Sequence, residues 1–147
     1  MYKVTDGDTF QCRLNNGVSL SKVRMANIDA PEIKQAYGLF AKNALSQMIQ
    51  WQMVELVDIK QDKYKRIVAT VIYNGENINL KMVENGHAWA YGKKKIYKLA
   101  ENKARERRIG LFSSGYAERP SEYRKRSKVK RYTPRRKYTK RYKKYKY

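Results

Sequence analysis

Residues 8–25, DTFQCRLNNGVSLSKVRM, predict two strands joined by a tight turn. In residues 8–14, apolar side chains alternate with polar ones, which is typical of a strand with one buried face. Asn15-Asn16-Gly17 then supplies the residue types that a hairpin turn favours. Residues 18–25 continue as a second strand with apolar side chains of their own. The stretch therefore predicts a β-hairpin.

Three further strands are expected around this hairpin. Residues 2–5 are the stub of a first strand, and residues 54–59 and 67–73 are rich in β-branched side chains. Asn74-Gly75 closes the last of them with another hairpin turn signal. The sequence thus contains five short strands.

Helical segments lie between and after these strands. Apolar residues recur at the spacing of one helix face at Ala41, Ala44, Leu45, Met48 and Ile49, and this stripe is interpreted as core. A second helix is expected from about residue 80 to a glycine cap at Gly86, and a third from about 96 to 109, stopped by Gly110. Together the pattern predicts a mainly β, α+β fold: a small closed β-barrel with helices packed against it.

The C-terminal residues 119–147 have a different composition. They carry 15 Lys and Arg against one acid, a net charge of +14, and Val129 is their only aliphatic residue apart from proline. Because such a segment buries little apolar surface, it is predicted to be a disordered basic tail, and the folded domain is predicted to span residues 1–118. The tail also holds six tyrosines, which can stack on bases.

Composition limits the possible functions. The 147 residues carry 34 Lys and Arg against 13 Asp and Glu, a net charge of +21, which indicates a polyanionic partner. With one cysteine (Cys12) and one histidine (His87), disulfide frameworks and ordinary zinc sites are excluded. A nucleophile activated by histidine would depend on His87, which is more simply a helix-end or surface residue. No apolar run is long enough to cross a membrane, and residues 1–10 lack the apolar block of a signal peptide.

Four acids stand out in this basic chain: Asp6, Asp8, Asp29 and Glu32. Asp6-Gly7 could be an ordinary turn, and Asp29 with Glu32 could be a helix capping box. The alternative is that these carboxylates converge on a hard cation such as Ca²⁺, with carbonyls and waters as its other ligands. The sequence leaves both interpretations open.

Two arginines favour the second interpretation. Strand alternation turns Arg24 away from the side of Val23 and Met25, and Arg66 stands at the head of the strand over residues 67–73. Either could be an ordinary surface arginine. Acids that hold a cation beside two guanidinium groups would, however, form a site for a phosphodiester, whose developing charge they would neutralise.

Five motifs carry a resemblance to a known family. VTDGDTF (4–10), VRMANIDAPE (23–32), AYGLFAKNAL (36–45), DKYKR (62–66) and VENGHAWAY (83–91) resemble the staphylococcal nuclease (thermonuclease) family, in the family's order and over roughly residues 3–113. The resemblance implies an OB-fold five-stranded barrel with three helices. It also implies a Ca²⁺-dependent endonuclease that hydrolyses DNA and RNA by in-line attack of water and leaves 3′-phosphate ends.

The resemblance also implies a role for each matching residue. Asp8, Asp29 and the main-chain carbonyl of Ala30 would bind the metal, with Asp6 just behind them. Glu32 would activate water, and Arg24 and Arg66 would bind the scissile phosphate. Lys63 and Tyr64 would lie near a terminal phosphate of the substrate. Lys65 departs from the glycine usual before the second arginine, and the first strand is shorter than is usual in the family.

Two alternative functions are also compatible with the sequence. The same barrel could be a non-catalytic module that binds nucleic acid, and the tail could attach the protein to an anionic surface such as a membrane or cell envelope. The expected protein is a monomer that acts on single-stranded or locally melted DNA and RNA. The tail is expected to add affinity without taking part in the chemical step. Calcium availability favours an exported or envelope location.

Overall fold

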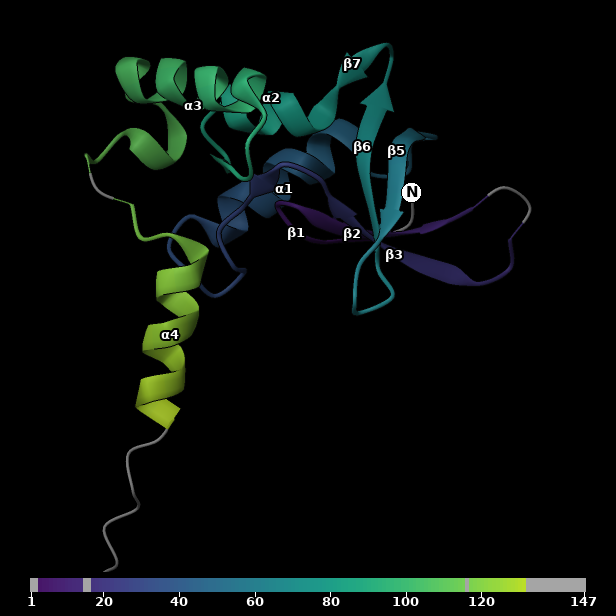
Figure 1. Ribbon diagram of the computed structural model, residues 1–147, viewed down its shortest axis with the longest axis horizontal. Coiled ribbons are helices and arrows are strands. Elements are labelled where there is room, and N and C mark those ends of the chain that lie inside the picture. The colour runs from purple at the N-terminus through teal and green to yellow at the C-terminus, as the bar shows by residue number, and fades with distance from the viewer. Residues whose placement is uncertain (1–2, 15–16, 116, 132–147) are drawn as a thin grey trace, which may run out of the picture.

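The structure is a computed structural model that describes residues 3–14, 17–115 and 117–131 (Figure 1). Its main sheet has the strand order β1-β2-β3-β6-β5, and β7 pairs with β6. These strands are β1 (Lys3–Asp6), β2 (Thr9–Arg13), β3 (Leu20–Met25), β5 (Glu55–Gln61), β6 (Ile67–Tyr73) and β7 (Glu76–Asn77). A separate antiparallel pair joins β4 (Ile28–Asp29) to β8 (Trp89–Ala90).

The predicted hairpin forms the centre of this arrangement. β2 and β3 pair antiparallel, with Phe10 opposite Val23 and Thr9 opposite Arg24. β3 then pairs parallel with β6, so that Val23 lies beside Ile67 and Met25 beside Ala69. All five predicted strands are therefore confirmed, while the two-residue strands β4, β7 and β8 were not predicted because they are too short to show a period.

The prediction of a closed barrel is confirmed only in part. The mixed α+β architecture and the strand order are consistent with an OB-like fold. Among the described residues, however, no pairing joins β1 to β5, so the sheet is not closed. The physical reason is the length of β1, whose four residues also contain an irregularity in their pairing with β2 between Val4 and Asp6.

Helices cover the sheet at one end of the molecule. α1 (Gly38–Ile49) packs on β1 and α2 (Ile78–Glu84), and α2 packs on β6 and α3 (Lys95–Arg107). The predicted apolar stripe of α1 does face the core: Ala41, Leu45 and Ile49 are fully buried. The largest fully buried side chains of the protein include Trp89, Phe10, Met25, Ile28, Leu45, Ile49, Ile78 and Met82.

The turns and helix caps that glycines were predicted to form are confirmed in part. Asn74 and Gly75 both adopt positive φ, 51° and 74°, as a tight hairpin turn requires. Gly86 follows α2 with φ 72°, which confirms the predicted cap. α3, in contrast, ends at Arg107 and is capped by Arg108, whose φ is 50°, so the helix stops before Gly110. Gly110 instead packs against Gly86 and is the first residue of the short 3₁₀-helix η1 (Gly110–Phe112).

The prediction that residues 119–147 are disordered is wrong over their first part. Residues Pro120–Arg131 form α4, a fourth helix that extends away from the body of the protein (Figure 1). Pro120 is well suited to the first helical position, and the Glu122 carboxylate accepts a hydrogen bond from the Arg119 main-chain N–H at 3.2 Å. The prediction counted apolar surface alone and missed these start signals. Residues 132–147 lie outside the described residues.

None of the helices in the described part of the chain is both long enough and apolar enough to cross a bilayer.

Candidate active site

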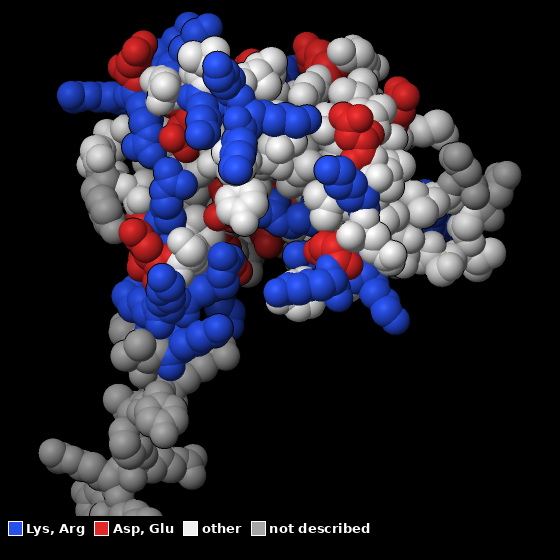
Figure 2. All heavy atoms as spheres, in the orientation of Figure 1, with Lys and Arg blue, Asp and Glu red and all other residues white. Residues whose placement is uncertain are grey.

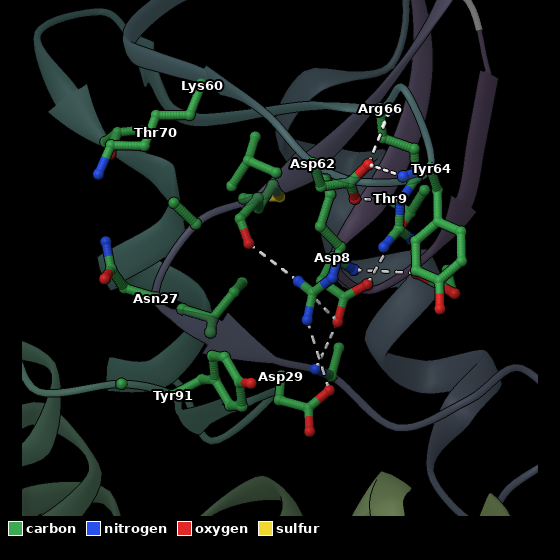
Figure 3. Close-up of a pocket in the computed structure, with 18 of the residues that line it drawn as sticks. Asp8, Thr9, Asn27, Asp29, Lys60, Asp62, Tyr64, Arg66, Thr70 and Tyr91 are labelled. Carbon is green, nitrogen blue, oxygen red and sulfur yellow. Dashed lines mark hydrogen bonds and ion pairs between the residues drawn. The ribbon is translucent and has the colours of Figure 1, made fainter.

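One open pocket, of about 970 Å³, collects every residue that the sequence singled out for chemistry. It lies where the turn between β1 and β2, the end of β3, the β5–β6 turn and the loop after β8 meet, and α4 reaches it with one side chain (Figure 3). The predicted residues that line it are Asp6, Asp8, Arg24, Asp29, Ala30, Glu32, Lys63, Tyr64 and Arg66.

The register of β2 and β3 positions the first members of the site. The Met25 main-chain N–H donates to the Asp8 carbonyl at 2.8 Å, which holds the turn before β2 against the end of β3. Val23 and Met25 are buried in the core, so the alternation of β3 turns Arg24 to the opposite face, into the pocket. The predicted orientation of Arg24 is thereby confirmed.

Arg24 lies between two of the carboxylates. Its Nη1 is 3.2 Å from Asp8 Oδ2, its Nη2 is 3.5 Å from Asp29 Oδ1, and Nη1 also donates to the Met25 carbonyl at 2.9 Å. A strand (β3), a turn and β4 thus bring together three residues that are up to 21 positions apart in the sequence.

Asp8 is the most deeply buried acid of the site, with 5% of its surface exposed. Its Oδ2 accepts from the Ala30 main-chain N–H at 2.8 Å, and its Oδ1 accepts from Thr9 Oγ1 at 2.9 Å. The Asp8 N–H in turn donates to Asp6 Oδ1 at 3.2 Å. These bonds fix the Asp8 side chain and place Asp6 beside it.

Burial and crowding disfavour the charged forms of two carboxylates of the site. Burial, and then the neighbouring Asp8, raise the pKa of Asp6 to about 8. Burial and Asp8 also raise the pKa of Asp29, against the opposing effect of Arg24. Crowded, partly buried carboxylates of this kind favour a hard cation, which would remove their repulsion.

The acids do not already form a ready-made metal centre. Among the described residues, no three Asp, Glu, His or Cys side chains are close enough together to hold an ion by themselves. Asp8 and Asp29 are linked instead through the guanidinium group of Arg24. The donor set, with hard carboxylate oxygens, the Ala30 carbonyl and space for water in an open pocket, still fits Ca²⁺ by its chemistry.

Glu32 lies in the loop before α1 and is no capping residue. α1 begins at Gly38, and Asp29 belongs to β4, so the capping-box alternative is wrong. The Glu32 main-chain N–H donates to Gln35 Oε1 at 3.1 Å, and the Gln35 N–H donates to the Glu32 carbonyl at 2.9 Å. The Glu32 side chain is left to face the pocket, where Arg124 Nη1 lies 2.6 Å from its Oε1.

Arg66 is held on another wall of the pocket, by Asp62. Its Nε donates to Asp62 Oδ2 at 2.8 Å, while the main-chain N–H groups of Arg66 and Tyr64 donate to Asp62 Oδ1, each at 2.9 Å. Lys65 adopts φ 61°, a left-handed conformation that glycine favours, so the turn forms with lysine in this place. Tyr64 stacks its ring beneath Lys63 and Arg66.

Sequence reasoning missed several members of the site. Asp62 could have been found from its spacing of four residues before Arg66 within a turn. Arg124 was not predicted, because only the contacts of α4 with the body of the protein bring it to the pocket. Lys60, Tyr91 and Lys94 also line the pocket without having been singled out.

His87 lies outside this pocket. Its Nδ1 is 3.0 Å from the Tyr37 hydroxyl, the two rings stack, and burial lowers the pKa of the imidazole. The position just after α2 agrees with the prediction of a helix-end residue, and it assigns His87 a packing role between α2 and the start of α1.

The chain is similar in sequence to several proteins named as nucleases. A family profile described as "Staphylococcal nuclease homologue" matches residues 22–114. An "Uncharacterized endonuclease" of Haemophilus influenzae is 41% identical over 130 residues, which cover 86% of this chain and 72% of that protein. A "Micrococcal nuclease" of Shigella flexneri is 36% identical over 86% of this chain and 79% of its own length. The "Staphylococcal-like nuclease CAN1" of Arabidopsis thaliana is 35% identical over 71% of this chain, but only 33% of the plant protein is covered.

Proposed function

Because this chain belongs to the staphylococcal nuclease family, we propose that it is a Ca²⁺-dependent nuclease that hydrolyses the phosphodiester backbone of DNA and RNA. The observation that carries the proposal is the convergence of Asp8, Arg24, Asp29, Glu32 and Arg66 on one pocket. These residues come from four separate segments of the chain, and each brings a charged group to the same space.

The residues suited to hold Ca²⁺ are Asp8, Asp29 and the carbonyl of Ala30, with Asp6 next to them. When bound, the ion would neutralise negative charge on the phosphate and help to orient water. The raised pKa values of Asp6 and Asp29, caused first by burial and then by the neighbouring Asp8 carboxylate, support this assignment, because a bound cation would stabilise the charged form of each acid.

The chain's own side chains supply the rest of the chemistry. Arg24 and Arg66 would bind the non-bridging oxygens of the scissile phosphate through their planar guanidinium groups. The Glu32 carboxylate would accept a proton from the attacking water. In-line attack at phosphorus with departure of the 5′ oxygen would leave a 3′-phosphate end. Lys63 and Tyr64, exposed on the β5–β6 turn, would lie near a terminal phosphate.

A purely binding module is the second candidate, and the charge of the pocket weighs against it. Figure 2 shows Lys and Arg gathered over α3 and α4, with acidic side chains in the hollow between them. A surface that only bound phosphates would gain affinity by losing acids such as Asp8 and Asp29, because a charged carboxylate repels a polyanion. Their presence in the pocket is explained by hydrolysis and not by binding alone.

The test is cleavage of single-stranded DNA by the full chain with Ca²⁺ and then with excess chelator. Cleavage is expected to stop in chelator and to return when Ca²⁺ is restored. Asp8→Ala should abolish cleavage with Ca²⁺ present. Asp58→Asn is the matched control, because Asp58 lines the same pocket without contacting Arg24, and it should keep most of the activity. Undiminished cleavage in chelator would disprove the metal requirement.

A further inference from the structure

α4 brings a third arginine to the pocket, one that the nuclease site proposed above does not use. Arg124 lines the pocket together with Asp8, Arg24 and Asp29, and its Nη1 lies 2.6 Å from Glu32 Oε1 (Figure 2 shows the basic surface of α4 beside the hollow). The carboxylates of Glu32, Asp29 and Asp8 all act on the guanidinium group of Arg124 and raise its pKa. Its charge is therefore felt across the whole acidic part of the site.

The position of Arg124 is set by contacts at the root of α4. The buried Gln35 side chain donates from Nε2 to the Glu118 carbonyl, and Ala117 packs on the cluster around Trp89 and Phe112. Glu118 in turn accepts two bonds from Arg126, at 2.9 and 3.1 Å. Pro120 is buried as well. The first turn of α4 is thus attached to the body, and Arg124 stands within reach of the site.

The pair between Arg124 and Glu32 is open to exchange. The side chain of Arg124 is 51% exposed and that of Glu32 is 36% exposed, so water screens their attraction. Exposed ion pairs of this kind contribute little to stability. A phosphate offers the guanidinium group two parallel charge-assisted hydrogen bonds, which is a better partner than a single carboxylate oxygen.

While the pair lasts, Arg124 occupies Glu32 Oε1 and hinders the approach of water to that oxygen. A nucleic acid phosphate that bound Arg124 would release the Glu32 carboxylate to accept a proton. Binding of substrate and exposure of the base would then be one event.

We propose that Arg124 of α4 is a substrate-binding residue, which exchanges its ion pair with Glu32 for a phosphate of the bound nucleic acid. The inference rests on the proposed nuclease function for its substrate class, but it concerns a segment outside the five motifs that define the family resemblance. It predicts that Arg124 contributes to affinity for the substrate and little to the chemical step at saturation.

The first experiment compares Arg124→Gln with Lys125→Gln in the full chain. Both remove one positive charge from an exposed position of α4, but Lys125 does not line the pocket. With a short single-stranded DNA as substrate, Arg124→Gln should raise KM about tenfold, which corresponds to the loss of about 1.4 kcal/mol of binding. Lys125→Gln should raise it less than about twofold, and kcat should stay within about threefold in both variants. Equal KM values for the two variants would overturn the proposal. So would a higher kcat with an unchanged KM in Arg124→Gln, since Arg124 would then only inhibit Glu32.

The second experiment measures the exchange directly, by the dissociation constant of the same DNA. Glu32→Gln, which also slows cleavage, should tighten binding more when Arg124 is present than in the Arg124→Gln background, because the freed guanidinium group then binds phosphate. Additive effects would overturn the exchange. This cycle does not depend on turnover: if the wild-type chain fails to cleave but the coupling persists, the nuclease function is disproved and the role of Arg124 stands. If the chain cleaves DNA and no coupling is found, the nuclease function stands and the proposed role of Arg124 is disproved.

Discussion

At the scale of single residues, the site is organised by carboxylates that position arginines. Asp62 accepts three hydrogen bonds from the β5–β6 turn and thereby fixes the Arg66 side chain. Arg24 is held in the same way, between Asp8 and Asp29. Each guanidinium group is oriented before a substrate arrives, which lowers the reorganisation that catalysis would require.

Arg66→Lys is expected to lower kcat by about 10²–10³, because lysine keeps the charge but lacks the planar fork that can bind two phosphate oxygens. The free energy of unfolding should change by less than about 1 kcal/mol, since the ion pair with Asp62 is partly exposed. Steady-state kinetics and urea unfolding check the two halves of this prediction. Lys65→Arg, one residue earlier, is a control that changes a neighbouring side chain without removing a charge. A wild-type rate for Arg66→Lys would show that Arg66 does not stabilise the transition state.

His87 makes the stability of the protein depend on pH. Its burial lowers the pKa of the imidazole below the ordinary value of about 6.5. As the pH falls below about 6.5, the unfolded chain binds a proton that the folded chain does not, so the free energy of unfolding decreases, by at most about 1.4 kcal/mol per pH unit.

The check is the difference in Tm between the wild type and His87→Gln, in which the amide can still bond to Tyr37 but does not titrate. The wild type should lose stability relative to the variant between about pH 7 and pH 5. A constant difference over that range would show that the folded and unfolded chains share the same histidine pKa.

At the scale of elements, sequence reasoning found most of the fold and most of the site. The five strands and the helices α1, α2 and α3 follow from local periodicity and from turn residues such as Asn74-Gly75. Arg24, too, was oriented correctly by strand alternation. The features that could not be predicted from the sequence depend on contacts between distant segments. The ion pairs at Arg24, the cap of α3 at Arg108 and the docking of α4 all depend on tertiary partners. Likewise, whether the outer edge of β1 pairs with another strand depends on tertiary contacts and not on the sequence of β1 alone.

The contact between Gly86 and Gly110 gives a direct test of how α2 and α3 are joined. A Cβ on Gly110 would lie 2.2 Å from the Gly86 carbonyl oxygen, which accepts a hydrogen bond from the Leu111 N–H at 2.8 Å. Gly110→Ala should therefore lower the free energy of unfolding by about 3 kcal/mol or more, from steric overlap added to the strain of positive φ.

Gly75→Ala is the matched control for this substitution. Gly75 also has positive φ, 74°, but nothing lies within 4 Å of its missing Cβ. The control should lose only about 1 kcal/mol, the penalty for alanine in the left-handed region. Urea unfolding of the two variants measures the difference, and equal losses would mean that the chain relieves the overlap at Gly110 by moving.

At the scale of the whole molecule, the distribution of charge divides the C-terminal basic segment into two parts. Residues 120–131 form α4, which contributes Arg124 to the pocket. Residues 132–147 carry eight Lys and Arg and no acid. Truncation after Arg131 removes positive charge but keeps α4, whereas truncation after Arg119 also removes Arg124. Comparing the two separates the contribution of net charge to nucleic acid binding from that of the pocket.

Both truncations should flatten the dependence of log K on log salt, because fewer counterions are released on binding. If about five charges of residues 120–147 engage phosphates together, removing them all should reduce the slope by roughly 3.5–4.5 units. Only the longer truncation should also remove the coupling between Glu32 and DNA affinity, while kcat at saturating substrate stays within about threefold. A slope unchanged by both truncations would indicate that the basic segment serves another polyanion. A collapse of kcat would mean that α4 takes part in the chemical step.

The side chain of Gln35 joins two parts of the protein that are far apart in the sequence. Its Oε1 accepts from the Glu32 N–H, and its Nε2 donates to the Glu118 carbonyl. One buried amide group is therefore shared between the loop of Glu32 and the root of α4. If α4 detaches, Gln35 loses a partner inside the protein, and the main-chain bond at Glu32 weakens with it. We therefore expect the two segments to open together, so that hydrogen exchange should give their amide groups a common free energy of opening.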